Sequence, residues 1–310
     1  MFEILTYGMT VAQQVAILFI LILIGYFIAK FKLMTRTGID QIIDILLYIV
    51  TPLVIINSCI SVPFNQKTVT DLGIATLCAA GTHFVGIIFA MFFKKVKPLS
   101  QAAVYRNGII FSNGGFMAIP LVKALTGDYG VFLVSGYVIV LNVLAWMYGV
   151  RLFPEGKKSG RIRAFVNPGS IGVLIGLPQF FFVQKVPEVI AKPVEYIAGL
   201  NTPVAMIVMG FFLLGSGVLE GIKDWKMWLV TLIRLAVIPL CMLVIFKYAF
   251  GLEDTLLIAC MVSACAPCAT NNMMLSAKFG GDTALATRMI SFSTIVSIFT
   301  MPIVLALTQL

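Results

Sequence analysis

The sequence predicts an all-helical integral membrane protein of ten transmembrane helices, built as an inverted repeat of five and five. Two observations predict this class: long apolar segments alternate with short polar gaps, and motifs of the first half return in order in the second half. A third observation adds detail. One apolar segment in each half is interrupted by proline beside hydrogen-bonding residues, so helices four and nine are expected to be broken and crossed.

Composition excludes a soluble protein. The chain has 310 residues, of which 60% are hydrophobic and 11% are charged, whereas soluble domains carry about 25% charged residues. Its mean hydropathy is +1.03. The formal net charge of +9 does not indicate nucleic-acid binding, because Lys and Arg fall in the gaps between apolar segments. The first residues include Glu3 and no basic residue, so no signal peptide is expected.

Each apolar segment approaches the length that a membrane-spanning helix needs, about 20 residues. Basic residues end the first segment at Lys30 and the third at Lys94, and Pro52 lies inside the second. The helices of the first half are expected at Val11–Ala29, Ile39–Ile60, Asp71–Phe93, Ser100–Leu125 and Tyr129–Val150.

A short polar stretch, residues 152–163, separates two halves of similar length. Most of the 22 Lys and Arg residues fall in the alternate gaps that include this stretch. The positive-inside rule therefore predicts that this linker lies in the cytoplasm and that both termini lie outside. The expected location is the plasma membrane. The helices of the second half are expected at Ala164–Val183, Val194–Leu219, Met227–Phe250, Thr255–Phe279 and Thr283–Ala306.

The two halves repeat each other. A Leu-Ile-Gly motif ending at Gly25 returns at Gly176, and a Thr-Pro motif ending at Pro52 returns at Pro203 with the same separation. A Gly-Asp pair also follows each interrupted helix. Because five is an odd number of helices, the second half enters the membrane upside down relative to the first. This inverted repeat is a common construction of secondary transporters.

The interruptions lie in equivalent helices of the two halves. The fourth helix contains Asn113 and two glycines before Pro120, and the ninth contains Pro267 before Thr270. A break of this kind exposes a helix N-terminus, with free N–H groups and about half a positive charge. Two such ends that meet at mid-membrane predict a site for an anion such as a carboxylate. The substrate-binding residues predicted from the breaks are Ser112, Asn113, Gly114, Gly115, Pro120, Pro267, Thr270, Asn271 and Asn272.

The other prolines and the cysteines are expected to be structural. Proline is common in membrane helices, which accounts for Pro239 and Pro302 as well as the paired prolines of the repeat. The six cysteines all lie in apolar segments, where cysteine is a small buried hydrophobe. The CxxC spacing from Cys265 to Cys268 lacks the surroundings of a redox motif. No metal, cofactor or catalytic residue is expected.

Ionisable residues inside membrane helices are costly and often functional. His83 either carries a coupling proton or is a neutral histidine bonded to a neighbouring helix. Arg234 either balances an anion or an acid, or extends to the cytoplasmic surface, and the second interpretation is favoured. Asp71 either caps the third helix, as favoured, or belongs to a proton path. These three residues are the candidates for coupling or charge balance.

Other charged residues near helix ends are expected to have structural roles. Asp128 and Asp282 follow glycine and are expected to be N-caps. Asp44 and Glu195 occupy equivalent positions in the repeat and are expected to face water or a dimer interface. Lys123 lies just past the break and near the outer surface, so it is either functional or simply solvated.

At the interrupted helices and at several other motifs, the chain resembles the auxin efflux carrier family, which includes the plant PIN auxin carriers and bacterial malonate-type permeases. The matching features extend over nearly the whole chain. They are Asn113-Gly-Gly-Phe-Met-Ala-Ile-Pro120-Leu-Val-Lys-Ala, Asn167-Pro168, Asn201-Thr-Pro203, Ala266-Pro267 and Ser297-Ile-Phe-Thr-Met-Pro302.

The resemblance implies the fold shared with bile-acid symporters and sodium/proton antiporters, an elevator movement and a homodimer. It also implies a scaffold made of residues 1–63 and 164–222, and a transport domain made of residues 64–151 and 223–310, joined by the linker 152–163. Within the site, it implies that Asn113 contacts the substrate carboxylate and that Asn142 lines the same site. The central linker is far shorter than the cytoplasmic loop of the long plant carriers, so plant auxin itself is a less favoured cargo.

The leading hypothesis is a secondary or potential-driven efflux carrier for a small organic anion, such as an auxin- or malonate-like carboxylate. Export is favoured because an inside-negative potential favours loss of a monoanion by about 2.3 kcal/mol per 100 mV. One alternative is a sodium- or proton-coupled symporter or antiporter of the same fold with a different cargo, and another is a non-transporting membrane sensor. An enzyme is not expected, because the sequence carries no HExxH or Walker A motif.

Overall fold

The computed structural model describes residues 2–156, 168–183, 186–215, 217–252 and 254–309. Every regular element within these ranges is a helix, which confirms the predicted all-helical class. Residues 157–163 of the expected linker lie outside the described residues, as do the beginning of the expected sixth helix and Asn167 of the matching motifs. The linker prediction therefore stays a prediction.

The elements are labelled α for α-helices and η for 3-10 or π turns. In chain order they are α1 (Phe2–Lys30), α2 (Arg36–Ile45), η1 (Leu46–Val50), α3 (Thr51–Ser61), α4 (Gln66–Ala90), η2 (Met91–Phe93), α5 (Leu99–Ile110), η3 (Gly114–Ala118), α6 (Ile119–Leu144), η4 (Ala145–Gly149), η5 (Val150–Leu152), α7 (Pro168–Phe182), α8 (Glu188–Gly199), α9 (Asn201–Leu213), α10 (Val218–Gly221), α11 (Trp225–Leu232), η8 (Ile233–Val237), α12 (Ile238–Leu243), η9 (Val244–Ala249), α13 (Asp254–Cys265), α14 (Asn271–Phe279) and α15 (Thr283–Leu307).

Among the described residues, 6 helices are long and apolar enough to cross a membrane. Several expected spans fall short of this length because the helix is broken, so that α5, α13 and α14 are each only part of a span. The second part of the expected fourth helix runs into the expected fifth helix within α6, with a break at Gly127, whose φ is 69°. The 6 helices that are long and apolar enough to cross a membrane are Arg36–Ser61, Gln66–Phe93, Gly114–Leu152, Glu188–Leu213, Trp225–Ala249 and Thr283–Leu307.

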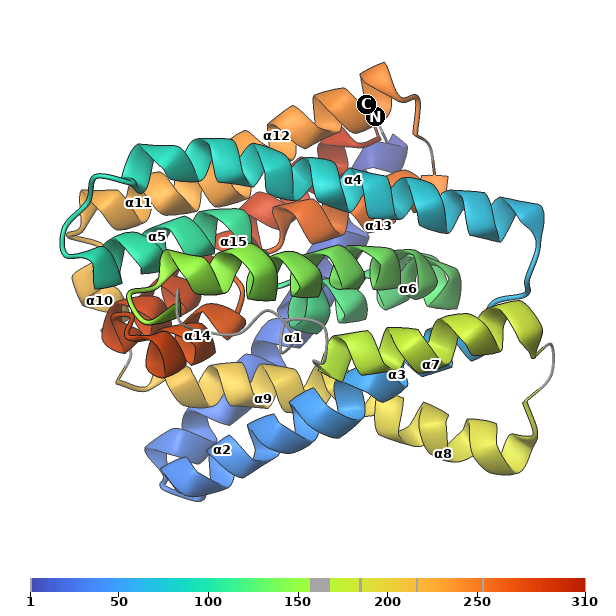
Figure 1. The fold of residues 1–310 in the computed structure, drawn as a ribbon, viewed down its shortest axis with the longest axis horizontal. Coiled ribbons are helices and arrows are strands. Elements are labelled where there is room, and N and C mark those ends of the chain that lie inside the picture. Colours follow the sequence, from blue (N-terminus) through green and yellow to red (C-terminus); the bar gives the residue numbers. More distant parts are fainter. Residues whose placement is uncertain (1, 157–167, 184–185, 216, 253, 310) are drawn as a thin grey trace.

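The helices form two groups that are discontinuous in sequence (Figure 1). In the view of Figure 1, α2, α3, α7, α8 and α9 lie along one side, where α3 packs against α7 and α8 and where α1 packs against α9. Along the other side α4 packs against α5 and α6, and α13 packs against α6, α12 and α15. The interrupted segments lie in the second group, at the ends of α5 and α13.

Glycines allow the closest helix approaches in the first group. A methyl group on Gly25 of α1 would overlap the backbone of Ile207 in α9, and one on Gly210 of α9 would overlap the backbone of Ile22 in α1. Gly176 of α7 lies against α3, where its added carbon would stand 3.0 Å from the sulfur of Cys59. Gly25 and Gly176 are the two glycines that the sequence repeat matches, and each lies at an interface between a first-half and a second-half helix.

Candidate functional site

The two interrupted segments cross each other where neither is helical. After α5 and α13 end, the chains run antiparallel for a few residues. The N–H of Asn113 donates to the carbonyl oxygen of Pro267 at 2.7 Å, and the N–H of Ala269 donates to that of Phe111 at 3.0 Å. An unpaired backbone group in lipid costs several kcal/mol. Each segment therefore pairs the backbone groups that the break in the other has freed.

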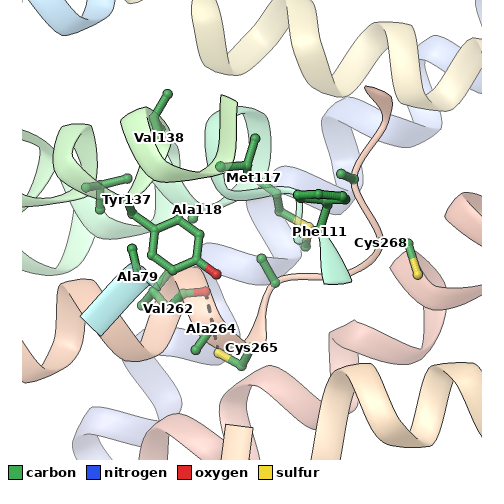
Figure 2. Close-up of a cluster of buried hydrophobic side chains, with 14 of the residues drawn as sticks. Ala79, Phe111, Met117, Ala118, Tyr137, Val138, Val262, Ala264, Cys265 and Cys268 are labelled. Carbon is green, nitrogen blue, oxygen red and sulfur yellow. Dashed lines mark hydrogen bonds between the residues drawn. The ribbon is translucent and has the colours of Figure 1, made fainter. Parts of the chain in front are cut away.

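Side chains from neighbouring helices hold this crossing on both sides. The hydroxyl of Ser293 in α15 accepts the N–H of Cys268 at 3.2 Å, and the Ser112 hydroxyl donates to the Tyr137 hydroxyl of α6 at 3.2 Å. Figure 2 shows Tyr137 beside Ala264 and Cys265 of α13, and Phe111 beside Met117. Tyr137 and Phe111 are 2% and 0% exposed, so the crossing is enclosed by protein rather than by lipid.

The breaks do not occur at Pro120, although that proline helped to predict one of them. Pro120 lies in the first turn of α6, where a missing N–H is tolerated. Before it, η3 is a wide turn in which the N–H of Ala118 donates to the carbonyl of Asn113 at 3.3 Å. The helical segment after the break therefore begins immediately after Asn113. Pro120 is buried within the first turns of this segment.

Arg234 binds the carbonyl ends of both incoming helices. Its side chain is 0% exposed and donates to Ile109 at the end of α5 at 3.1 Å, to Ala266 just beyond α13 at 3.3 Å, and also to Ala264. The last carbonyls of a helix carry about half a negative charge and have no partner within the helix. The favoured expectation, that Arg234 extends to the cytoplasmic surface, is therefore wrong. The carbonyls at two helix ends provide enough partners to keep the guanidinium inside the protein.

The opposite ends of the breaks, where η3 and α14 begin, face a common cavity of about 180 Å³. These starts carry the free N–H groups and the positive ends of the helix dipoles. The two kinds of helix end thus lie in separate places: the negative ends of α5 and α13 lie at Arg234, and the positive starts of η3 and α14 lie at the cavity. The cavity is lined by Tyr48, Thr51, Ser112, Asn113, Gly115, Phe116, Val138, Leu141, Asn142, Ala145, Trp146, Ala269, Thr270, Asn271, Met274, Leu275 and Lys278.

The structure brings part of the predicted substrate-binding set together around this cavity. The other members are buried beside it: Gly114 lies against the Tyr137 ring, Pro267 supplies a carbonyl to the crossing, and Asn272 donates to the carbonyl of Val104 at 3.1 Å. Pro120 also lies outside the lining. The predicted residues that line the cavity are Ser112, Asn113, Gly115, Asn142, Thr270 and Asn271.

The cavity asparagines keep part of their hydrogen-bonding capacity free. The side-chain oxygen of Asn271 is buried and has no partner within the described residues. Asn142 uses its amide nitrogen on the carbonyl of Val138 at 2.9 Å. The amide of Asn113 lies 3.7 Å from the sulfur of Met209, which is a weak acceptor. These amides can bind a polar ligand without adding a fixed charge.

His83 lies behind the crossing and not in the cavity. It is 0% exposed, and its Nδ1 lies 2.7 Å from the carbonyl of Ala79 in its own helix. Its ring contacts Phe111 and Tyr137, with centroid distances of 5.6 and 5.1 Å. Nε2 has no partner within the described residues. The expected bond to a neighbouring helix is therefore replaced by one within α4, and a coupling role stays a prediction.

Asp71 is not an N-cap. Asn65 caps α4, because its side chain accepts the N–H of Thr68 at 2.9 Å, and Asp71 lies further along the helix. The Asp71 carboxylate accepts from Lys67 at 2.6 Å and from the Tyr129 hydroxyl at 2.5 Å. The sequence-based boundary placed the helix start too late, since the polar first turn of α4 does not resemble a membrane segment. Asp71 instead joins α4 to α6.

Removing the Tyr129 hydroxyl is expected to weaken this junction. Hydrogen bonds to charged groups contribute about 1.5–3 kcal/mol, so Tyr129→Phe should lower the free energy of unfolding by about that amount. Denaturant unfolding of the purified variant measures it, and Tyr196→Phe, at an exposed position in α8, is the control. Equal stability of both variants would show that the Asp71 contact contributes nothing.

The remaining charged residues divide between the expected roles and new ones. Asp282 caps α15, accepting the N–H of Leu285 at 2.9 Å, which confirms that prediction. Asp128 was expected to be a cap but forms an ion pair with Lys123 at 3.1 Å, and both side chains are about half exposed. Asp44 and Glu195 are exposed, as expected.

Sequence reasoning missed Lys278 and Trp146, which also line the cavity. Lys278 is one of the 22 Lys and Arg residues, and it was considered only for the orientation of the chain in the membrane. Helical spacing could have found it, because Asn271, Met274, Leu275 and Lys278 follow the i, i+3, i+4, i+7 pattern of one helix face. Trp146 had no comparable signal, since nothing in the sequence distinguishes it from a lipid-facing aromatic residue.

The described residues contain no group of three or more His, Cys, Asp or Glu side chains that could hold a metal ion. All six cysteines are unbridged, and only Cys241 is not fully buried. Cys265 and Cys268 both lie at the crossing, with their sulfur atoms apart (Figure 2). We therefore attribute the CxxC spacing of these two cysteines to the packing of small residues where the two segments meet.

Comparison with known proteins agrees with this architecture. The chain matches the family described as membrane transport protein over residues 10–164 and 156–305. It is also 24% identical to an uncharacterized transporter of Methanocaldococcus jannaschii over 211 residues, which are 64% of this chain and 68% of that protein. The family is the auxin efflux carrier-like group that the motifs resemble. Because the match extends over nearly the whole chain, this protein belongs to the membrane transport protein family.

Proposed function

We propose that this membrane transporter is a secondary or potential-driven carrier for small organic anions, with a carboxylate as the bound group. The observation that carries the proposal is the arrangement of the two broken helices. Their N-terminal ends face one cavity beside Asn113, Asn142 and Asn271, while Arg234 binds their C-terminal ends. An anion in the cavity meets free N–H groups and helix dipoles of favourable sign.

The asparagine amides at the cavity are neutral, which suits a carrier, because a carrier must release the ligand that it binds. A ligand bound by amides and helix ends can leave again, which transport requires. An inside-negative membrane potential favours outward movement of a monoanion by about 2.3 kcal/mol per 100 mV. Efflux therefore needs no coupled ion, and this is the direction that we propose.

The proposed mechanism is an elevator movement within a ten-helix inverted repeat. The two helix groups of Figure 1 correspond to the proposed scaffold (1–63 and 164–222) and transport domain (64–151 and 223–310). The equivalent interfaces at Gly25 and Gly176 support the repeat, because each joins one helix from either half. We further propose a homodimer in the plasma membrane, with both termini outside and the linker in the cytoplasm.

A sodium- or proton-coupled carrier of the same fold is the second candidate. In sodium-coupled transporters, carbonyls at half-helix ends coordinate the ion. Here the carbonyls of Ile109, Ala264 and Ala266 bind Arg234 instead. No Asp or Glu is among the described residues that line the cavity. His83, buried behind the crossing, is the residue that keeps proton coupling under consideration.

Flux measurements with an Asn113 variant test the proposal. Proteoliposomes with an imposed potential should transport labelled carboxylates, for example malonate or indole-acetate. Asn113→Ala should reduce carboxylate affinity about 10-fold or more, because a hydrogen bond to a charged group contributes about 1.5–3 kcal/mol. The affinity is measured from the concentration dependence of flux.

Asn57→Ala is the matched control, because Asn57 lies in α3 and outside the cavity. It should transport like the wild type. Normal affinity in Asn113→Ala would refute the site assignment, whereas absence of carboxylate flux in the wild type would refute the function. Repeating the flux with sodium replaced by choline and, separately, with and without a pH gradient separates the two candidates, since flux through a coupled carrier depends on one of these two ion gradients.

A further inference from the structure

Among the described residues that line the cavity, Lys278 is the one with a charged side chain, and it lies at the far end of the helix whose start faces the crossing. Asn271, Met274, Leu275 and Lys278 share one face of α14 and all line the cavity. A rise of 1.5 Å per residue separates the levels of Asn271 and Lys278 by about 10 Å. The cavity therefore has a positive helix start near one end and an ammonium group towards the other.

The Lys278 ammonium has no carboxylate partner in the part of the chain that the structure describes. The ion pairs found there join other residues, for example Arg288 with Glu220 at 2.5 Å. Lys278 instead lies over the ring of Trp146, with Nζ 5.8 Å from the centroid, and Trp146 also lines the cavity. This contact holds the charge at the cavity wall while leaving it free to bind an anion.

On α14, the cavity-lining side chains between these two positive positions, Met274 and Leu275, are apolar. Leu141 and Ala145 also line the cavity, together with the neutral amide of Asn142. A ligand that fills the cavity therefore meets a positive end, an apolar middle and a second positive end. Malonate cannot match this spacing, because its two carboxylates are attached to the same carbon atom.

We propose that Lys278 binds a second acidic group of the substrate, so that the preferred substrates are extended dianions with an apolar spacer between their acidic groups. This inference rests on the proposed function, in which the first carboxylate binds at the crossing. Lys278 is then a specificity-determining residue. Substrates with a single carboxylate still bind, but they do not use it.

A lysine in the last turn of a helix also interacts favourably with the helix C-terminus. That purely structural role would change stability but would not discriminate between ligands. The test must therefore compare ligands of equal length that differ only in the second acidic group. The α,ω-dicarboxylates from malonate to azelate and the monocarboxylates of matching length from propionate to nonanoate provide such pairs.

Thermal-shift titration of the purified full-length protein gives a Kd for each ligand. In the wild type, the longer dicarboxylates should bind about tenfold more tightly than their monocarboxylate partners, and malonate should show no such advantage. Lys278→Met and Lys278→Gln should lose the advantage, so that each dicarboxylate binds with about the Kd of its monocarboxylate partner. Lys278→Arg should keep it, and Lys95→Met, at an exposed position outside the cavity lining, should match the wild type.

The outcomes separate this inference from the proposed function. Monocarboxylates and dicarboxylates that bind the wild type equally would overturn the role of Lys278 alone, as would an advantage that survives in both neutral variants. If no carboxylate binds the wild type, the proposed function fails and the inference fails with it. Two neutral variants are used so that misfolding of one does not prevent the comparison.

Discussion

Arg234→Met is expected to be among the most destabilising single substitutions in this chain. The substitution leaves the carbonyls of Ile109, Ala264 and Ala266 without their donor inside the protein. A buried acceptor without a partner costs about 1–3 kcal/mol. After allowing for the desolvation cost that the buried arginine itself carries, the free energy of unfolding should fall by about 3 kcal/mol. Denaturant unfolding in detergent measures this change.

Two further variants separate loss of hydrogen bonds from loss of charge. Arg234→Lys keeps the charge but lacks the planar fork of five donors, so it should recover only part of the stability. Arg151→Met removes an exposed arginine and should have little effect. An Arg234→Met protein as stable as the wild type would show that the carbonyl ends find other partners, such as water.

Gly210→Leu is the second substitution with a large expected effect. Gly210 lies where α9 meets the backbone of Ile22 in α1, so any side chain must separate the two helices. Overpacking a core costs about 1–3 kcal/mol when side chains can adjust. Because the obstacle here is backbone, we expect about 3 kcal/mol or more. Thermal unfolding and the fraction recovered as a folded species by size-exclusion chromatography measure the effect.

Gly73→Leu is the matched control within another helix. A carbon added to Gly73 in the middle of α4 meets no atom within 4 Å, and the residue is exposed. A non-glycine residue removes the flexibility that glycine brings to a helix, so the control should be neutral or slightly stabilising. If Gly73→Leu and Gly210→Leu behaved alike, the close approach of α1 and α9 would not be the cause.

The existence of the two broken helices could be predicted from the sequence because lipid imposes a strict rule on backbone groups. Proline and glycine beside asparagine in equivalent segments violate the pattern of an ordinary spanning helix. The position of the break could not be predicted to the residue. Pro120 marks the first turn of a helix rather than its end, and the break depends on pairing between Asn113 and Pro267, which are distant in the sequence.

Roles of ionisable residues were harder to predict, because they depend on partners from other helices. Arg234 lies close enough to the end of its membrane segment for its side chain to reach the surface. Nothing in the neighbouring sequence indicates that it binds backbone carbonyls at the ends of α5 and α13. Asp71 was assigned to a helix start that lies earlier in the chain. Asp282, in contrast, was predicted correctly, because its cap is a contact with Leu285 only three residues later. The same local signal failed at Asp128, which pairs with Lys123 instead.

The contact of Arg234 with both crossing segments has a consequence for thermodynamic symmetry. Arg234 belongs to η8, so the guanidinium connects a third helix to both broken ones, and the three must move together or lose these bonds. In the proposed carrier, the cavity groups that move with Arg234 therefore keep the same geometry towards the ligand on either side of the membrane, whereas Tyr48 and Thr51 of the proposed scaffold change position relative to them. We expect the dissociation constants from the two sides to differ only through the contacts with these scaffold residues.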